Sequence, residues 1–214
     1  EALEIAHKIP GMDSNTEVQA ILAFCLKQQG QYEGMEEAVL RWRSLEPKDP
    51  SSYLFLAQHA VDLKDNARAD AELQKMVAAN PENQQLALFR AQALDRLGMA
   101  REAGEAFDRL PPEPAFLTAK SDFFRGQGEN DKAKAILQTI LVKSPGDTEA
   151  SVKLAQLLAA ENDRDGAFRC LEAALQQNPK KTDREKIILA RAALHGSTGR
   201  WNEVKSDCEG ILKE

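Results

Sequence analysis

The sequence lacks the features that mark membrane-spanning and nucleic-acid-binding proteins. No apolar run approaches the ~20 residues that a transmembrane helix needs, and no basic segment followed by an apolar stretch marks a signal peptide. The 214 residues carry 28 Lys and Arg against 34 Asp and Glu, which gives a net charge of −6. A chain this acidic has no general attraction to phosphate. The composition therefore argues against nucleic acid as a partner and against direct membrane insertion.

Cysteine is scarce as well, with three residues in the chain. Cys25, Cys170 and Cys208 form no C-x-x-C pair, which argues against a disulfide framework or a zinc site. Each falls in an apolar helical pattern, so we expect all three to behave as small buried hydrophobic residues. Reduced thiols favour the cytoplasm, while the bacterial periplasm stays open as an alternative.

Patterns typical of catalysis are missing too. His7, His59 and His195 are isolated, without an H-x-x-x-H pair or an acidic partner at fixed helical spacing. The segment GQGEND at 126–131 has too few glycines for a nucleotide loop and follows a helical pattern rather than a strand. The sequence therefore predicts no enzyme, no metal and no cofactor, and His195 reads as a partly buried structural residue.

An internal repeat is the main positive signal, and three markers carry it in one register. Each marker recurs with gaps of 34, 34, 30, 34 and 37 residues. The markers are a small residue within a helical stretch (Ala23, Ala57, Ala91, Ser121, Ala155, Ala192), a turn residue (Gly30, Lys64, Gly98, Gly128, Asn162, Gly199) and a second mostly small residue (Met35, Ala69, Ala103, Ala133, Ala167, Val204).

Each repeat is predicted to be a pair of antiparallel helices. Apolar residues recur at three- and four-residue spacing, and no interval shows the alternation of a strand. Gly or Asn at most of the turns supplies the left-handed residue that ends a first helix. Capping boxes are expected at Ser14-x-x-Glu17 and Thr182-x-x-Glu185, and Asp49 precedes Pro50 at another helix start. Tyr32 and Trp201 open second helices, and we expect both to pack in the core.

This pattern resembles the tetratricopeptide repeat family, whose period is 34 and whose second helix reads A-x-x-x-F/L…P. The resemblance covers essentially the whole chain and implies an all-α fold, a right-handed α-solenoid of about six antiparallel helix pairs. The usual Trp is replaced by Tyr53, Ala87, Leu117 or Ser151, and the usual Leu by Arg90, Lys120 or Arg191. The matching segments are Ala69…Leu73…Pro81, Ala103…Phe107, Ala133…Leu137…Pro145 and Ala167…Leu171…Pro179.

The repeat register divides the chain. Residues 1–10 are predicted to end a helix of a preceding repeat, and we expect the sequence to be part of a longer protein because its terminal units lack a capping element. The array over 11–214 is divided into units at about 14–47, 48–81, 82–111, 112–145, 146–179 and 180–214.

Three prolines interrupt the third unit. Pro111 and Pro112 end its second helix early, and Pro114 can open the next helix from the first turn. Pro111-x-x-Pro114 also matches the minimal polyproline-ligand pattern, but structural punctuation is the favoured interpretation. The unit is 30 residues long, so we expect a local change of curvature here.

In proteins of this family the first helices line a concave groove that holds a partner segment. The resemblance therefore implies a groove with an apolar row, a mostly Gln row one turn further along each helix, and charged residues beyond. The apolar row is Phe24, Leu54, Leu88, Val152 and Leu189. The polar row is Gln58, Gln92, Asp122 and Gln156, and Lys27, Val61, Asp62, Asp95, Arg96 and Arg125 follow.

The predicted function is a non-catalytic scaffold that binds a protein or peptide segment in this groove. The alternative is a structural assembly element that self-associates through its end repeats. A third hypothesis is RNA recognition, since pentatricopeptide repeats are also helix pairs, but the period of 34 and the mixed groove charge rank it last.

Overall fold

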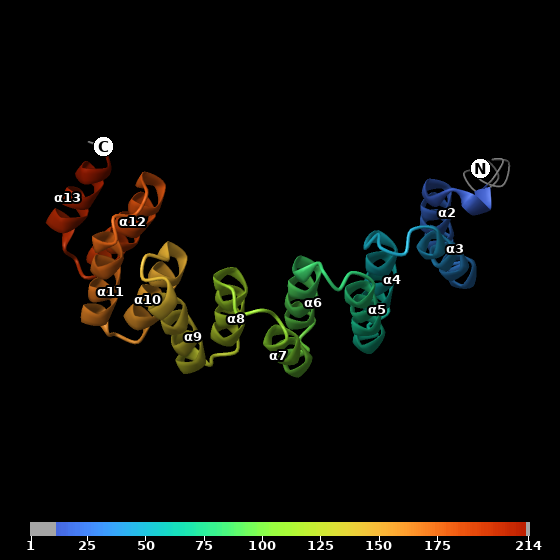
Figure 1. Ribbon diagram of the computed structural model, residues 1–214, viewed down its shortest axis with the longest axis horizontal. Helices are drawn as coiled ribbons and strands as arrows, with labels where there is room; N and C mark the ends of the chain where they lie inside the picture. Colours follow the sequence, from blue (N-terminus) through green and yellow to red (C-terminus); the bar gives the residue numbers. More distant parts are fainter. Residues whose placement is uncertain (1–11, 213–214) are drawn as a thin grey trace. The chain divides into compact units, whose positions relative to one another are not determined.

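The computed structural model describes residues 12–212, so the helix end predicted for residues 1–10 lies outside the described residues (Figure 1). Between residues 12 and 212 every regular element is helical: a short 3₁₀ helix, η1 (Met12–Ser14), and twelve α-helices. The α-helices are α2 (Thr16–Gln28), α3 (Tyr32–Leu45), α4 (Ser51–Asp62), α5 (Asn66–Ala79), α6 (Gln84–Arg96), α7 (Ala100–Asp108), α8 (Pro114–Gly126), α9 (Asn130–Lys143), α10 (Thr148–Ala160), α11 (Arg164–Gln176), α12 (Lys181–Ser197) and α13 (Trp201–Leu212).

The helices form pairs, and the pairs form two compact units that meet between Leu110 and Pro111. Unit 1 contains the pairs α2/α3, α4/α5 and α6/α7, and unit 2 contains α8/α9, α10/α11 and α12/α13. In each pair the two helices pack closely against one another. The predicted all-α fold of repeated helix pairs is confirmed. No helix within residues 12–212 combines the length and hydropathy needed to cross a membrane.

Every first helix ends in the same turn. The N–H two residues beyond the C-cap donates to a carbonyl five residues back, and the residue between them is left-handed, which is the Schellman motif. The left-handed residues are the six predicted turn positions, of which Lys64 (φ 61°) and Asn162 (φ 66°) are not glycine. The six donors are Gln31, Asp65, Met99, Glu129, Asp163 and Arg200, and their acceptors are Leu26, Ala60, Leu94, Phe124, Leu158 and His195.

Helix starts differ in part from the predicted caps. Asn15 rather than Ser14 caps α2, because the Asn15 side chain accepts from the Val18 N–H at 3.1 Å while Ser14 belongs to η1. The Thr182 box is also wrong, because α12 begins at Lys181, its N-cap is Lys180 without a side-chain cap, and Thr182 therefore lies inside the first turn. The Asp49 carboxylate does bond the first N–H of α4, that of Ser51, at 3.0 Å.

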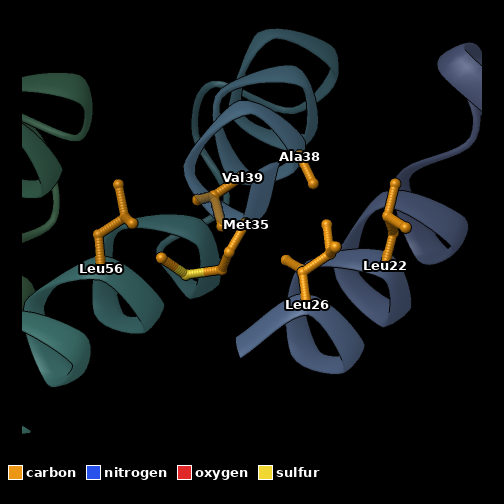
Figure 2. Packing of buried hydrophobic residues seen from close by; sticks show 7 residues of the cluster. Leu22, Leu26, Met35, Ala38, Val39 and Leu56 are labelled. Carbon is orange, nitrogen blue, oxygen red and sulfur yellow. The ribbon is translucent and has the colours of Figure 1, made fainter. Parts of the chain in front are cut away.

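The repeat markers form the interior of each unit. All six small residues of the first helices are buried, from Ala23 at 0% exposure to Ala192 at 7%. Their lack of bulk lets the second helix approach closely, and the second-helix markers from Met35 to Ala167 are each 0% exposed. Figure 2 shows this packing in unit 1, where side chains of α3 lie between α2 and α4. The labelled residues are Leu22, Leu26, Met35, Ala38, Val39 and Leu56.

Two of the departures from the family pattern are ion pairs between helices. Arg90 on α6 stands where an apolar residue is usual, and its guanidinium lies 2.7 Å from the Asp70 carboxylate on α5. Arg191 on α12 likewise pairs with Asp207 on α13, which is 7% exposed. A charge at a half-buried position needs such a partner. Arg90 and Arg191 therefore each have a charged partner on the neighbouring helix.

The proline cluster ends α7 early. This second helix has 9 residues, whereas the other second helices have 12 to 14. Residues 111–113 belong to no helix, and Pro114 occupies the first turn of α8. The boundary between the compact units falls at this point. The prediction that the prolines act as structural punctuation agrees with this geometry.

Candidate binding faces on the first helices

The first helices carry the predicted groove rows on a face next to their buried small residues. Leu54, Gln58 and Val61 on α4 follow i, i+4, i+7 spacing, which places them on one face. Gln58 is exposed, while Leu54 and Val61 are half-buried. Next to α4, Phe24 on α2 is 56% exposed. The predicted apolar row of unit 1 is therefore accessible from solvent in part.

In unit 1 a pocket of about 590 Å³ lies between α4 and α6. Leu54, Gln58 and Val61 line it from α4, as the predicted rows require. From α6 the lining comes from Phe89, Ala93 and Arg96, and from α5 it comes from Ala69 and Leu73.

Two predicted groove residues of α6 lie outside this lining. Leu88 and Gln92 are half-buried, and the pocket is lined instead by the residues that follow each of them, Phe89 and Ala93. One residue is about 100° of rotation around a helix. α6 therefore turns a neighbouring face toward α4, and Phe89, which is 41% exposed, was missed because the repeat register fixes a position but not the rotation.

Unit 2 repeats the arrangement between α10 and α12, in a smaller pocket of about 240 Å³. Val152, Gln156 and Ala159 line it from α10, at the same spacing as their counterparts on α4. From α12 it is lined by Ala190, Ala193, Leu194 and Ser197. Leu189, a predicted groove residue, lies outside the lining and is 55% exposed.

A second and wider pocket of unit 2, about 780 Å³, lies at the first turns of α8, α10 and α12. Val152 and Gln156 contribute to it too, and its charged lining is mixed, with Lys153 and Lys186 beside acidic residues. Lys153 is already paired with Asp122 at 2.7 Å, and Arg125 lies 3.5 Å from the same carboxylate. The predicted site residues Asp122 and Arg125 thus form part of an ion-pair network.

The polar row is also partly engaged within the chain. The Gln58 Nε2 donates to the Asp62 carboxylate at 3.0 Å, and the Lys27 ammonium lies 2.6 Å from the other carboxylate oxygen. The hydrogen bond from Lys27 is the main cause that lowers the pKa of Asp62. Gln156 is exposed, and Gln92 is half-buried. Gln58 therefore keeps one N–H and its carbonyl oxygen for a partner.

The histidines do not converge on a site. His59 is 2% exposed and its ring packs 4.8 Å from that of Tyr32. Burial, followed by the nearby positive charge of Lys27, lowers the pKa of His59. His195 packs on Phe168, with its Nε2 4.0 Å from Asp207. Between residues 12 and 212 no cluster of His, Cys, Asp and Glu has the arrangement of a metal site, and His7 falls outside the described residues.

Three expected core residues are exposed. Trp201 is 69% exposed and Tyr32 is 45% exposed, so the prediction that both pack in the core was wrong. The first residue of a second helix stands at the rim of its pair, where the neighbouring turn covers little of a large ring. Cys208 is exposed as well, while Cys25 and Cys170 are half-buried. Burial raises the pKa of the Cys170 thiol to about 11.

The fold places the chain in the class of helical-repeat proteins. Residues 124–195 match the family model of the tetratricopeptide repeat, and the predicted family is thereby confirmed. This family generally supplies protein–protein interaction scaffolds and is not a family of enzymes. A comparison of the sequence with curated proteins finds no match.

Solved structures share the fold at low sequence identity. PilW, described as a widely conserved type IV pilus biogenesis factor, is 16% identical over 93% of each chain with a TM-score of 0.54. A tetratricopeptide repeat protein from Parabacteroides merdae is 14% identical over 99% of this chain and 82% of its own, with a TM-score of 0.53. MamA is 19% identical over 75% of this chain and 96% of its own, with a TM-score of 0.50. These likenesses concern the fold alone.

Proposed function

We propose that the chain is a non-catalytic interaction scaffold that holds a segment of a partner protein against its first helices. The observation that carries the proposal is the same lining in both units. An apolar residue and a Gln one turn later line a pocket between neighbouring first helices, as Leu54 and Gln58 on α4 and as Val152 and Gln156 on α10. Apolar pockets with a few polar groups are the usual form of a binding site.

The apolar residues and the Gln residues have different roles in binding. Apolar side chains supply burial, at about 25 cal/mol per Å² removed from water. An exposed amide can bond the backbone of an extended segment without requiring a particular side chain, because Gln carries both donors and an acceptor. The chain would therefore select partners by apolar pattern and would fix their register through the amides.

The test uses peptides selected from a displayed random library against the whole chain, with affinities measured by isothermal titration. Phe24→Ala on α2 and Leu40→Ala on α3 form a matched pair, because these side chains are 56% and 55% exposed on the first and second helix of one repeat. We expect Phe24→Ala to weaken binding of peptides that reach α2 and Leu40→Ala to leave it unchanged. Equal losses, or a loss for Leu40→Ala alone, would contradict the proposal.

A second measurement addresses the amides. Replacing Gln58, Gln92 and Gln156 together with Ala should cost about 0.5–1.5 kcal/mol of binding for each Gln that contacts the peptide. Unchanged affinity with an intact circular dichroism spectrum would remove the amide row from the proposal. The binding site would then lie elsewhere on the helices.

The alternative is an assembly element that associates with copies of itself. It is favoured by the exposure of apolar residues on α13, where Trp201 is 69% and Leu212 is 85% exposed. Sedimentation velocity over a hundred-fold range of concentration tests it. A monomer at every concentration would reject self-association, whereas an oligomer that Trp201→Ala dissociates would support it over peptide binding.

A further inference from the structure

The two equivalent pockets between first helices differ in size for a reason that the sequence explains. In unit 2, α10 and α12 pack directly against each other, and Ala190 and Ala193 supply the small side chains that permit this approach. In unit 1 the position equivalent to Ala190 is Phe89, and α4 and α6 do not pack closely against each other. The pocket of unit 1 is about 590 Å³ and that of unit 2 about 240 Å³. Between α4 and α6, unit 1 therefore has a wider trough than unit 2 has between α10 and α12.

The trough is apolar along its walls. Leu54 and Phe89 stand on opposite sides, and Leu73 and Ala69 form its base. Phe89 is 41% exposed although it is a large aromatic residue on a pocket wall. Large aromatic side chains dominate the energetics of interfaces where they are buried. The walls therefore fit a bulky apolar side chain of a partner.

One charged residue, Arg96, lines the trough, and no residue in the described part of the chain neutralises it. Arg96, in the last turn of α6, is exposed and makes no ion pair with any residue of 12–212. The nearest acidic group on α4, Asp62, is already bonded by Lys27 and Gln58. In the pocket of unit 2 the equivalent position is Ser197, which is neutral. A free guanidinium at an apolar pocket is complementary to a carboxylate.

The length of the trough sets how much of a partner it can hold. Its lining runs along α4 from Ser51 to Val61, ten residues on, which corresponds to about 15 Å of helix. An extended chain covers that distance with about four or five residues.

We propose that the trough between α4 and α6 binds a short extended stretch of a partner protein in which a large apolar side chain lies beside an Asp or Glu. The apolar side chain enters between Leu54 and Phe89, and the carboxylate pairs with Arg96. This inference rests on the proposed function and adds the chemistry of the partner. It also assigns the recognition to unit 1, since the equivalent pocket of unit 2 has neither the volume nor the charge.

The probe is 3-phenylpropionate, which joins an aromatic ring to a carboxylate, with the neutral 3-phenylpropanamide for comparison. Both are titrated into the whole ¹⁵N-labelled chain at low salt and followed by NMR. We expect shifts at Leu54, Phe89 and Arg96, and an affinity for the acid about two- to five-fold above that for the amide, the range of an exposed ion pair. Arg96→Gln should abolish this preference.

Arg109→Gln is the matched control, because Arg109 is also an exposed arginine at the C-terminal end of a helix, but that helix is the second helix α7 and Arg109 does not line the trough. An arginine at that position interacts favourably with the helix dipole, so both variants share any loss of helix stability. Only Arg96→Gln should remove the preference for the acid. A preference that survives Arg96→Gln, absence of shifts at the trough, or equal shifts at Val152 and Ala190 would overturn the inference.

The displayed peptides separate this inference from the proposed function. If the peptides bind the first helices but carry no apolar–acidic pair, and Arg96→Gln leaves their affinity unchanged, this inference is wrong while the proposed function stands. If no peptide binds the first helices although 3-phenylpropionate prefers the trough through Arg96, the proposed function fails at its own test. Peptides that carry the pair and lose two- to five-fold in affinity with Arg96→Gln support both.

Discussion

Lys64 occupies a turn position where glycine is preferred, and its replacement should stabilise unit 1. The turns after α4 and α6 are equivalent: the Lys64 and Gly98 N–H groups each donate at 2.9 Å, to Val61 and Asp95, and both residues are left-handed, with φ of 61° and 74°. A side chain in this conformation costs about 1–2 kcal/mol. Glycine avoids that cost but loses about 0.5–1 kcal/mol more through the unfolded chain. Lys64→Gly should therefore raise the free energy of unfolding by about 0.5–1 kcal/mol.

The reverse change, Gly98→Lys, is the control. A Cβ at Gly98 would have no heavy atom within 4 Å, so its cost would be conformational rather than steric. We expect a loss of about 0.5–1 kcal/mol, measured by urea unfolding. Fluorescence of Trp42, which is buried in unit 1, reports this unit in a Trp201→Phe background. A Lys64→Gly variant that is no more stable, together with a Gly98→Lys variant that is no less stable, would refute the reasoning.

Three further changes probe the packing of the helix pairs. Glu72 is 5% exposed and its carboxylate lies 2.7 Å from the Arg43 guanidinium. Glu72→Ala should lower the free energy of unfolding in urea by about 3 kcal/mol, because the arginine loses its buried partner; a loss below about 1 kcal/mol would contradict this. Because the pKa of His59 is lowered in the folded chain, neutral His59 contributes fully to the free energy of unfolding above pH 6.5, and this contribution is lost as the pH falls from 6.5 toward the folded-state pKa. His59→Leu should therefore make stability fall less steeply across that range, and an unchanged pH profile would argue against it. Ala133→Leu, at a position with 0% exposure between α8 and α9, should lower stability by about 1–3 kcal/mol through overpacking, and a neutral effect in thermal unfolding would show that the helices can separate freely.

The turns and the repeat interior could be predicted from the sequence because both depend on local chemistry. A left-handed turn residue and a buried small residue recur at fixed spacing, so positions such as Gly98 and Ala91 are visible without coordinates. Asn162 was predicted for the same reason, since Asn tolerates the left-handed conformation. Even Lys64, which has no such tolerance, could be placed by the period of its neighbours.

The face that each first helix turns to its neighbour could not be predicted in the same way. On α6 the pocket is lined by Phe89 rather than Leu88. Packing against α5 and α7 sets the rotation of α6, and the repeat register carries no information about it. The difference between the two pockets depends on Phe89 in one unit and Ala190 in the other, which is a property of neighbouring repeats together. Trp201 was misplaced for a related reason: an aromatic residue suits a core, but the rim of a helix pair leaves it uncovered.

The most direct test of the account is to locate a bound segment by photo-crosslinking. The tightest peptide from the displayed library is synthesised with benzoylphenylalanine at its central apolar position and cross-linked to the whole chain. Mass spectrometry then identifies the attached fragment. The account predicts attachment within the first helices, with Ser51–Asp62 or Gln84–Arg96 favoured by the trough of unit 1. Attachment confined to second helices that do not line the trough, such as Asn130–Lys143 or Trp201–Leu212, would contradict it.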